Sequence, residues 1–336
     1  MSKVVVTIGD EAGIGPEVLL KALNYKEFTY KDFIIFGSKR ILNETYKNLD
    51  SKGIKNLVNP DNLDIKDLEI KNKYSDQPGA DSGHSSFLYL DNAIDLVKKL
   101  PNSALVTGPI CKKSWALAGH YYSGQTELLA EKCNASNFGM LFTAKSPLTG
   151  WRFNTLLAST HIPLNKVSSY LNKSLIHSKL DLLSNFCKRY NSKPYLKVAG
   201  INPHAGEEGI LGIEEKNWLC EAIAEWSAFN SEVTLEGPIS PDSCWVSSAK
   251  SWKTEGLINH DGILAMYHDQ GLIPMKVIAS NYSVNTTIGL PFVRTSPDHG
   301  TGFDIAGKGI AQSQSMIEAL KTARELSNNS SFLDSH

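Results

Sequence analysis

DGILAMYHDQGLIPMK, residues 261–276, is the stretch on which our prediction of the fold rests. Residues 262–267 form a continuous apolar run, which is typical of a short strand that is buried on both faces of a sheet. In open α/β sheets the ligand crevice lies beyond the carboxyl ends of the strands. His268 and Asp269, which follow the run directly, are therefore expected at a functional site, and Lys276 is expected on the next element.

Strands and helices are predicted to alternate along most of the chain. A strand at Val4–Ile8 leads into a glycine-rich loop, Gly9–Gly15, and then into a helix with Pro16 in its first turn. Residues 51–80 are polar and irregular and are expected to leave the sheet. The alternation predicts an α/β protein with a mainly parallel sheet. Further strands are predicted at residues 33–36, 104–106, 140–143, 155–158, 196–201, 233–235 and 284–288, and helices at 39–49, 82–100, 213–229 and 314–326.

The composition limits the possible partners. With 336 residues the chain has room for two domains that share a cleft. Lys and Arg (34) balance Asp and Glu (35), so bulk charge gives no reason to bind nucleic acid or a membrane surface. The five cysteines form neither a CxxC motif nor a disulfide pattern, and no apolar run approaches the about 18 residues of a membrane span. A reducing cytoplasm is therefore the expected location.

Three histidines occur in the same setting, each after an apolar strand at its polar exit. They are His161, His204 and His268. Neutral imidazole is a common ligand of divalent metals, and three imidazoles that leave one position open would form a catalytic site. A single histidine at a strand end is more often an ordinary hydrogen-bonding residue. Three histidines in the same setting favour a metal site, although no local spacing motif requires the three side chains to lie close together.

Cationic residues that suit an anionic ligand are Lys276 and Arg294. An arginine holds a carboxylate or phosphate through two hydrogen bonds, whereas a lysine supplies a more mobile charge or a proton. The segment Gly124–Glu127 begins a predicted helix, where Thr126 and the unpaired N–H groups of the first turn can bind an anion. The alternatives are solvated surface charges and a plain helix cap.

Two glycine-rich segments are candidates for contact with a nucleotide. The loop Gly9–Gly15 does not follow GxGxxG and carries no Walker lysine, so Rossmann and P-loop predictions fit poorly. The segment His299–Gly309 is richer in glycine and lets backbone approach a nucleotide closely, although a tight loop between helices would look the same.

The motifs resemble those of the 4-hydroxythreonine-4-phosphate dehydrogenases of vitamin B6 synthesis. The resemblance covers nearly the whole chain through GDEAGIGPE (9–17), TGPICK (107–112), GQTE (124–127), STHIPL (159–164), NPHAGEEG (202–209), AMYHDQG (265–271) and VNTTIGLPFVRTSPDHGT (284–301). It implies the fold of the isocitrate and isopropylmalate dehydrogenases, with two α/β domains, a cleft between them and no Rossmann unit. The first domain is expected at 1–125 with 290–336, including the dinucleotide loop. The second is expected at 126–289, with the metal site and the dimer interface.

The resemblance also implies roles for single residues. The divalent-metal ligands are matched by His161, His204 and His268, the third supplied by the partner subunit of a homodimer with shared active sites. The substrate-binding positions are matched by Gln125, Thr126, Lys276, Asn285 and Arg294. The adenosine-binding loop of the related dehydrogenases is matched by His299, Gly300, Thr301 and Asp304. Lys276 and Asp269 are expected to take catalytic roles.

The implied reaction is the oxidation of 4-phosphooxy-L-threonine at its C3 hydroxyl, followed by decarboxylation. It needs NAD or NADP and one divalent ion, which is zinc, magnesium or cobalt. The family usually has His where this chain has Gln125, and glutamine cannot carry a positive charge toward a phosphate. Dehydrogenases of 4-phospho-threonate or 4-phospho-erythronate therefore stay open as alternatives. Two other classes also stay open, a metal-dependent hydrolase and a non-catalytic protein that binds a small molecule.

Overall fold

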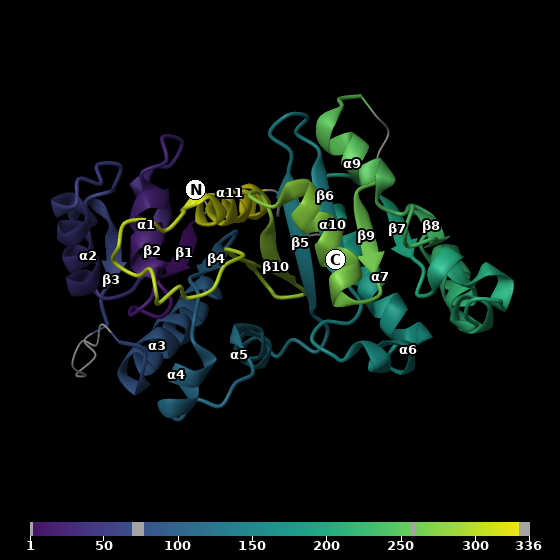
Figure 1. Ribbon diagram of the computed structural model, residues 1–336, viewed down its shortest axis with the longest axis horizontal. Helices are drawn as coiled ribbons and strands as arrows, with labels where there is room; N and C mark the ends of the chain where they lie inside the picture. Colours follow the sequence, from purple (N-terminus) through teal and green to yellow (C-terminus); the bar gives the residue numbers. More distant parts are fainter. Residues whose placement is uncertain (1–2, 69–76, 257–259, 329–336) are drawn as a thin grey trace. The chain divides into compact units, whose positions relative to one another are not determined.

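The computed structural model describes residues 3–68, 77–256 and 260–328 (Figure 1). The chain divides into two compact units. Unit 1 comprises Met1–Ser136 and Leu290–His336, and unit 2 comprises Asn137–Gly289. The sequence prediction put the first boundary at 125/126, whereas this division keeps α5 (Gln125–Lys132) within unit 1. The second boundary falls at 289/290 in both divisions.

Unit 1 contains five parallel strands in the order β3, β2, β1, β4, β11. Their bounds are β1 Val4–Thr7, β2 Phe33–Phe36, β3 Asp64–Lys66, β4 Ala104–Thr107 and β11 Val293–Ser296. The prediction that residues 51–80 leave the sheet is wrong in part, because β3 pairs with β2; residues 69–76 lie outside the described residues. Strand β11 was not predicted, since it is short and a charged residue interrupts its apolar pattern.

Helices cover both faces of the unit 1 strands. In Figure 1, α11 (Gln314–Asn328) lies above these strands and α3 (Ala80–Val97) below them. The first packs against β4 and β11, and the second against β1 and β4. The remaining helices of the unit are α1 Gly15–Leu23, α2 Lys39–Ser51, α4 Lys112–Leu117 and α5. No helix within the described ranges is long and apolar enough to cross a membrane.

Unit 2 contains six strands in the order β10, β5, β6, β9, β7, β8. Strands β6, β9, β7 and β8 are parallel neighbours, whereas β5 runs antiparallel to both β10 and β6. The predicted alternation of helices with a mainly parallel sheet is confirmed, although the antiparallel direction of β5 was not predicted. The strand bounds are β5 Gly139–Lys145, β6 Arg152–Leu157, β7 Tyr195–Ala199, β8 Thr234–Ile239, β9 Gly262–Ala265 and β10 Val284–Ile288.

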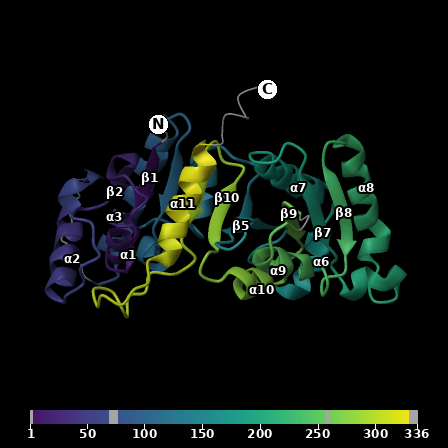
Figure 2. The ribbon, with the colours of Figure 1, turned by 90° about the horizontal axis from the view of Figure 1, so that it is seen from above.

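Strand β9 is buried on both faces, as its apolar run predicted. A Cβ atom at Gly262 would lie 2.8 Å from Leu183 on α7 (Lys173–Cys187). A Cβ atom at Gly271, on α10 (His268–Ala279), would lie 3.1 Å from Ala265. Successive residues of a strand point to opposite faces, so α7 and α10 cover opposite sides of β9 (Figure 2). The other helices of unit 2 are α6 Val167–Tyr170, α8 Cys220–Phe229 and α9 Val246–Lys253.

A histidine with no predicted role lies in the core of unit 2. His260 is 1% exposed, its Nε2 lies 3.2 Å from Ser248 Oγ, and its ring stands edge-on to Trp151 at 5.2 Å. Burial lowers the pKa of His260 to about 3, and the charge of Lys197 adds to the shift. The folded protein therefore keeps this imidazole neutral, because a charge at this position would be desolvated.

We expect His260 to make stability depend on pH. Its pKa is lower in the folded chain than in the unfolded chain, so the unfolded state takes up the proton first as the pH falls below about 6.5. The native protein should lose about 2 kcal/mol of unfolding free energy between about pH 8 and about pH 5 that a His260→Asn variant does not lose. Urea denaturation of both proteins measures this difference, and parallel pH curves would contradict the assignment.

Candidate functional site

The three candidate histidines follow three neighbouring strands. His161 follows β6, His268 follows β9 and His204 follows β7. These strands are adjacent and parallel in the order β6, β9, β7, so their carboxyl ends lie at one edge of the sheet. The predicted setting of each histidine at a strand exit is therefore observed, and the strand order brings the three exits together.

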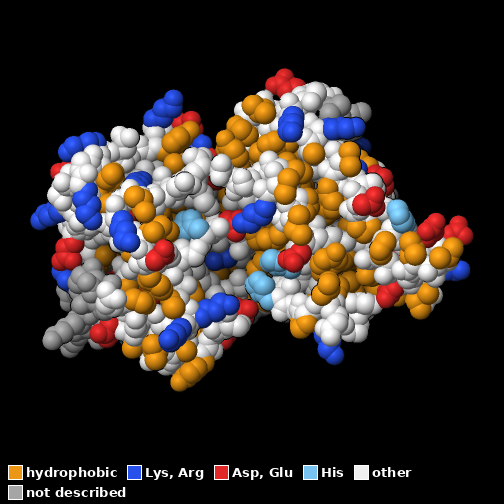
Figure 3. Space-filling view, in the orientation of Figure 1, with side chains coloured by type: hydrophobic (Ala, Val, Ile, Leu, Met, Phe, Trp, Pro, Cys, Tyr) orange, Lys and Arg blue, Asp and Glu red, His pale blue; other side chains and the backbone are white. Residues whose placement is uncertain are grey.

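His161 and His268 lie close to each other. Their ring centres are 5.5 Å apart and the rings are tilted by 44°. Two imidazoles on one tetrahedral zinc ion have ring centres roughly 5 Å apart, given metal–nitrogen distances of about 2 Å. Figure 3 shows histidine side chains grouped with an acidic side chain at the surface of unit 2. The observed separation fits a shared divalent ion.

Asp269 orients the ring of His268. The Nδ1 atom of His268 lies 2.8 Å from Asp269 Oδ1. An Nδ1–H that donates to the carboxylate leaves Nε2 as the atom with a lone pair, which is the tautomer that a metal ligand needs. Asp269 is thus placed to act on the ring. Lys276 lies eight residues after His268 along α10, about 12 Å away from it by the helical rise.

His204 lies on a strained turn. The backbone of His204, Ala205, Glu207 and Glu208 is left-handed, with φ values of 50°, 50°, 42° and 55°. Such a conformation costs on the order of 1 kcal/mol for each non-glycine residue. Strain of this kind persists where the surrounding structure imposes it, and it is concentrated at functional sites.

Glu215 holds this turn in place. Its carboxylate is buried and accepts hydrogen bonds from the backbone N–H groups of Ile201 (2.7 Å) and Asn202 (2.8 Å) and from Asn202 Nδ2 (2.8 Å). Three donors offset the desolvation of the carboxylate and anchor the chain just before His204. The sequence analysis did not single out Glu215, because nothing local distinguishes it from its neighbour Glu214.

The described part of one chain contains no group of three His, Cys, Asp or Glu side chains placed to hold a metal ion. The structure therefore brings His161 and His268 together and leaves His204 outside this pair. The substrate candidate Asn285, on β10, has a buried Oδ1 atom without a hydrogen-bond partner among the described residues. That acceptor suits a ligand hydroxyl or ammonium group.

A second group of candidates surrounds Arg294 in unit 1. The side chain is 4% exposed, and its Nη2 donates to Thr107 Oγ1 at 2.7 Å and to Gln125 Oε1 at 3.3 Å. Burial lowers the pKa of Arg294 to about 10, while the charge of Glu127 opposes the shift. A buried guanidinium suits a ligand anion, which restores interactions that the cation lost on leaving water. The sequence analysis missed Thr107, although its motif, TGPICK, was noted.

The start of α5 adds further hydrogen-bond donors to the candidates around Arg294. The helix begins at Gln125 after Gly124, with no side-chain cap, and Thr126 lies in its first turn. Gln125 Nε2 donates to the carbonyl oxygen of Gly108 at 2.9 Å. A Cβ atom at Gly124 would lie 3.9 Å from the ammonium nitrogen of Lys112, so a lysine that the sequence analysis did not consider also reaches this helix start. The helix start and the two cations suit an anion, while the carboxylate of Glu127 lies closer still, with Oε2 3.2 Å from the same Cβ position.

The two glycine-rich segments of unit 1 contact each other. The backbone N–H of Ile14 donates to the carbonyl oxygen of Thr301 at 2.8 Å, and a Cβ atom at Gly13 would lie 2.5 Å from that oxygen. His299 Nδ1 lies 3.0 Å from the carbonyl oxygen of Gly300, while its buried Nε2 has no hydrogen-bond partner among the described residues. This buried ring nitrogen is suited to accept a hydrogen bond from a donor group of a ligand.

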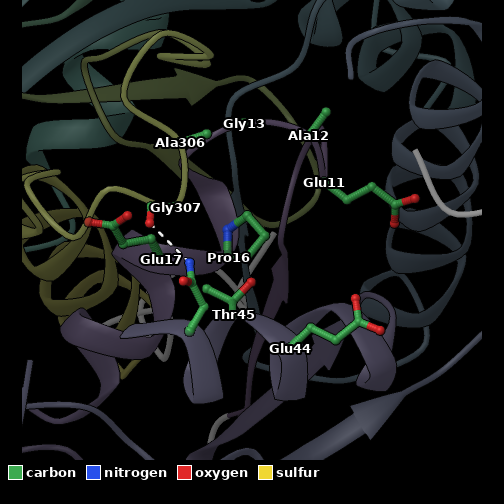
Figure 4. A pocket seen from close by; sticks show the side chains of 10 residues that line it. Glu11, Ala12, Gly13, Pro16, Glu17, Glu44, Thr45, Ala306 and Gly307 are labelled. Carbon is green, nitrogen blue, oxygen red and sulfur yellow. Dashed lines mark hydrogen bonds between the residues drawn. The ribbon is translucent and has the colours of Figure 1, made fainter. Parts of the chain in front are cut away.

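A cavity of about 320 Å³ lies beside these loops (Figure 4). The four predicted cofactor residues, including the exposed Asp304, do not line it; Ala306 and Gly307 of the same loop do. Asn48 Nδ2 donates to the carbonyl oxygen of Gly307 at 3.0 Å. The lining residues are Glu11, Ala12, Gly13, Pro16, Glu17, Glu44, Thr45, Asn48, Ala306 and Gly307.

A buried ion pair ties the end of this loop to α1. Glu17, in the first turn of α1, accepts hydrogen bonds from the backbone N–H groups of Gly309 (3.2 Å) and Ala311 (2.9 Å). Its partner Lys21, at 2.7 Å, donates to the carbonyl oxygens of the same two residues. The loop from residue 299 to 311 is therefore fixed by charged groups that the sequence analysis did not mark.

Comparison with solved structures first defines the class of fold. The isocitrate dehydrogenase of Methylococcus capsulatus aligns with a TM-score of 0.52 at 14% identity, covering 98% of this chain and 88% of that chain. At this level of identity the likeness concerns the fold alone. The predicted isocitrate dehydrogenase-like fold is confirmed.

The particular family follows from closer relatives. Residues 29–323 match the sequence profile of the family described as pyridoxal phosphate biosynthetic protein PdxA. The 4-hydroxythreonine-4-phosphate dehydrogenase of Synechococcus sp. (strain RCC307) is 46% identical over 97% of this chain and 100% of its own length. The crystal structure of the enzyme of that name from Klebsiella pneumoniae aligns with a TM-score of 0.82 at 29% identity, covering 97% and 100% of the two chains. This chain belongs to the PdxA family.

We expect Glu17→Gln to release the loop that ends at Ala311. The variant keeps the shape of the side chain but leaves Lys21 without its carboxylate in a site where the two side chains are 14% and 1% exposed. Breaking a buried pair in this way costs about 3 kcal/mol of unfolding free energy. Urea denaturation measures the loss, and hydrogen exchange at Gly309 and Ala311 should become faster.

Asp50→Asn is the matched control for this substitution. It makes the same chemical change in unit 1, at an ion pair with Lys55 whose side chains are 50% and 73% exposed. Exposed pairs contribute less than about 1 kcal/mol. If both variants lost equal stability, or if exchange at the loop were unchanged in Glu17→Gln, the anchoring role would be wrong.

Proposed function

We propose that this chain is a 4-hydroxythreonine-4-phosphate dehydrogenase of pyridoxal phosphate biosynthesis. It oxidises the C3 hydroxyl of 4-phosphooxy-L-threonine, passes the hydride to a nicotinamide cofactor and releases the carboxylate as CO2, which leaves 3-amino-2-oxopropyl phosphate. The observation that carries the proposal is the 46% identity with a relative of that name over its whole length. Relatives of the same name extend to Aquifex aeolicus at 36% identity over 96% of the chain.

The three histidines are the proposed metal ligands: His161 and His204 come from one chain, and His268 is supplied by the partner subunit of the dimer. The position of His161 and His268 at one edge of the sheet, with ring centres 5.5 Å apart, supports a ligand role for both residues. When bound, a divalent ion favours the alkoxide of the substrate and stabilises negative charge during decarboxylation. An all-imidazole donor set suits zinc or cobalt better than magnesium, which prefers oxygen ligands. Asp269 keeps the ring of His268 in the ligating tautomer.

The residues around Arg294 and the start of α5 form the proposed phosphate site. Arg294 supplies a buried charge and Thr126 a hydroxyl at the start of α5. Gln125 stands where the family usually has histidine, and it bonds both Arg294 and the carbonyl oxygen of Gly108. It therefore fixes the guanidinium without adding a second positive charge. Lys276 and Asn285 are the remaining substrate-binding residues in the proposal.

The nicotinamide cofactor, NAD or NADP, is assigned to the loop of His299, Gly300, Thr301 and Asp304. The unsatisfied Nε2 of His299 and the close contact of this loop with Gly13 support the assignment. Backbone groups and small residues let a dinucleotide approach closely, and the protein contributes orientation while the cofactor carries the hydride.

A homodimer in the cytoplasm is part of the proposal. Ile273 and Val277 of α10 are 61% and 80% exposed, and they are one helical turn apart. Exposed apolar side chains at this spacing suit a partner surface, and the helix that carries them begins with His268. A second copy of the chain docked there would meet the metal site directly.

A substrate panel tests the proposed activity. The purified protein should reduce NAD or NADP with 4-phosphooxy-L-threonine and release CO2, and unphosphorylated 4-hydroxythreonine should be a much poorer substrate. A faster reaction with 4-phospho-threonate or 4-phospho-erythronate would identify that acid as the substrate instead. If no phosphorylated hydroxy acid caused cofactor reduction, a hydrolase or a binding protein would be favoured instead.

Arg294→Lys tests the phosphate site within the same panel. The lysine keeps the charge but cannot bond Thr107 and Gln125 while it holds a phosphate through two hydrogen bonds, so KM for the phosphorylated substrate should rise about 10- to 100-fold. Arg324→Lys is the control, because Arg324 donates to the carbonyl oxygen of Glu27 at the surface of unit 1. Equal KM values in the two variants would exclude a phosphate role for Arg294.

Removal of the metal is a third test of the proposed function. Dialysis against a strong chelator should abolish cofactor reduction, because the alkoxide and the decarboxylation step both depend on the divalent charge. Zinc or cobalt should restore the rate in the native protein and fail to restore it in His161→Ala. Undiminished turnover in protein that elemental analysis shows to be free of metal would refute the metal role.

A further inference from the structure

A buried glutamine connects the exits of the strands that carry the histidines. Gln270 lies in the first turn of α10 and is 7% exposed. Its Oε1 accepts a hydrogen bond from the backbone N–H of Met266 at 2.6 Å. Its Nε2 donates to the carbonyl oxygen of Gly200 at 2.7 Å. Both ends of the amide are thus bonded to backbone, one to the exit of β9 and the other to the exit of β7.

The third exit joins the same network at Met266. The carbonyl oxygen of Met266 accepts hydrogen bonds from Ser159 Oγ at 2.7 Å and from the backbone N–H of Ser159 at 3.2 Å. Ser159 comes two residues before His161, and Met266 comes two residues before His268. Gly200 comes four residues before His204. One side chain and one backbone unit therefore connect the three segments that carry the candidate ligands.

We propose that Gln270 is a positioning residue that sets the spacing of the histidine-bearing loops for metal binding. The inference rests on the proposed metal site and adds a residue to which the family resemblance assigned no role. Gln270 does not touch the metal or the substrate in this proposal. It acts through Met266 and Gly200, and so through the placement of His268 and His204.

Glutamine is suited to this task because its amide offers an acceptor and a donor at one end of the side chain. Glutamate keeps the acceptor for the N–H of Met266 but loses the donor for the carbonyl oxygen of Gly200. Methionine has a similar shape and supplies neither. Met266 and Gly200 are both buried, so the loss of Gln270 would leave a backbone donor and a backbone acceptor unsatisfied. The strand exits would then shift or admit water.

The test compares cobalt binding in the native protein and in Gln270→Met. Metal-free protein is titrated with Co²⁺ by calorimetry, and the visible absorption of the bound ion reports its coordination. Loss of a residue that orients metal ligands costs about 10- to 100-fold in affinity. We expect this loss in Gln270→Met, a changed visible spectrum, and a lower kcat with little change in KM for the cofactor.

Ser146→Ala is the matched control in unit 2. Ser146 is buried, and its hydroxyl donates to the carbonyl oxygen of Trp252 at 2.7 Å, in the turn before β6 and thus at the opposite end of that strand from His161. The variant removes this bond and the two that the hydroxyl accepts from the backbone N–H groups of Leu148 and Thr149, all of them away from the ends of β6, β9 and β7 that precede the histidines. Its unfolding free energy should fall, whereas its affinity for Co²⁺ and its spectrum should match those of the native protein.

Gln270→Glu separates the two bonds and serves if Gln270→Met does not fold. A carboxylate at this position still accepts from Met266 but repels the carbonyl oxygen of Gly200, so Co²⁺ affinity should fall in a folded protein. Native affinity and an unchanged spectrum in a folded Gln270 variant would overturn the positioning role. Failure of the native protein to bind Co²⁺ would instead overturn the proposed metal site, so the two failures are distinguishable.

Discussion

The parallel pairing of β6, β9 and β7 is the constraint on which the candidate metal site depends. Parallel strands place their carboxyl ends at one edge, and neighbouring strands lie about 4.8 Å apart. The exits of β6 and β7 are thus separated by roughly 10 Å, with the exit of β9 between them. The histidines that follow these three strands therefore lie along one edge of the strands of unit 2.

Buried carboxylates stabilise irregular loops in both units. In unit 2, Glu215 accepts the N–H groups that precede the left-handed turn at His204. In unit 1, Glu17 accepts the N–H groups of Gly309 and Ala311 at the end of the glycine-rich loop. Each carboxylate lies at the start of a helical segment. Glu17 bonds a loop that is distant in sequence, and Glu215 bonds the segment just before an irregular turn. Charge-assisted bonds of this kind are stronger than neutral ones, so they can offset the backbone strain that a functional loop requires.

Some of these features could be read from the sequence and others could not. The apolar runs predicted β2 at its observed bounds and β9 within two residues, because burial on both faces leaves a continuous hydrophobic signal. Strand β10 was also predicted at its observed bounds, although its sequence, VNTTI, has polar and β-branched residues between two apolar ends. Strand direction leaves no such signal, so the antiparallel β5 was not anticipated. The histidines were found because each follows an apolar run. Glu215 and Gln270 were missed, since their roles depend on partners on other strands and loops, and no local pattern marks the left-handed turn of Ala and Glu residues.

The position of His268 connects metal binding with assembly. His268 is the first residue of α10, and the same helix carries the exposed Ile273 and Val277 further along. The described part of a single chain has no group of three ligands in place, and in the proposal His268 serves the ion of the partner subunit. An ion held only by His161 and His204 of one chain is bound weakly, so the histidine from the partner subunit decides the affinity. If a partner docks on α10, the ion and the partner both stabilise the same helix start, and by linkage each must then strengthen the binding of the other.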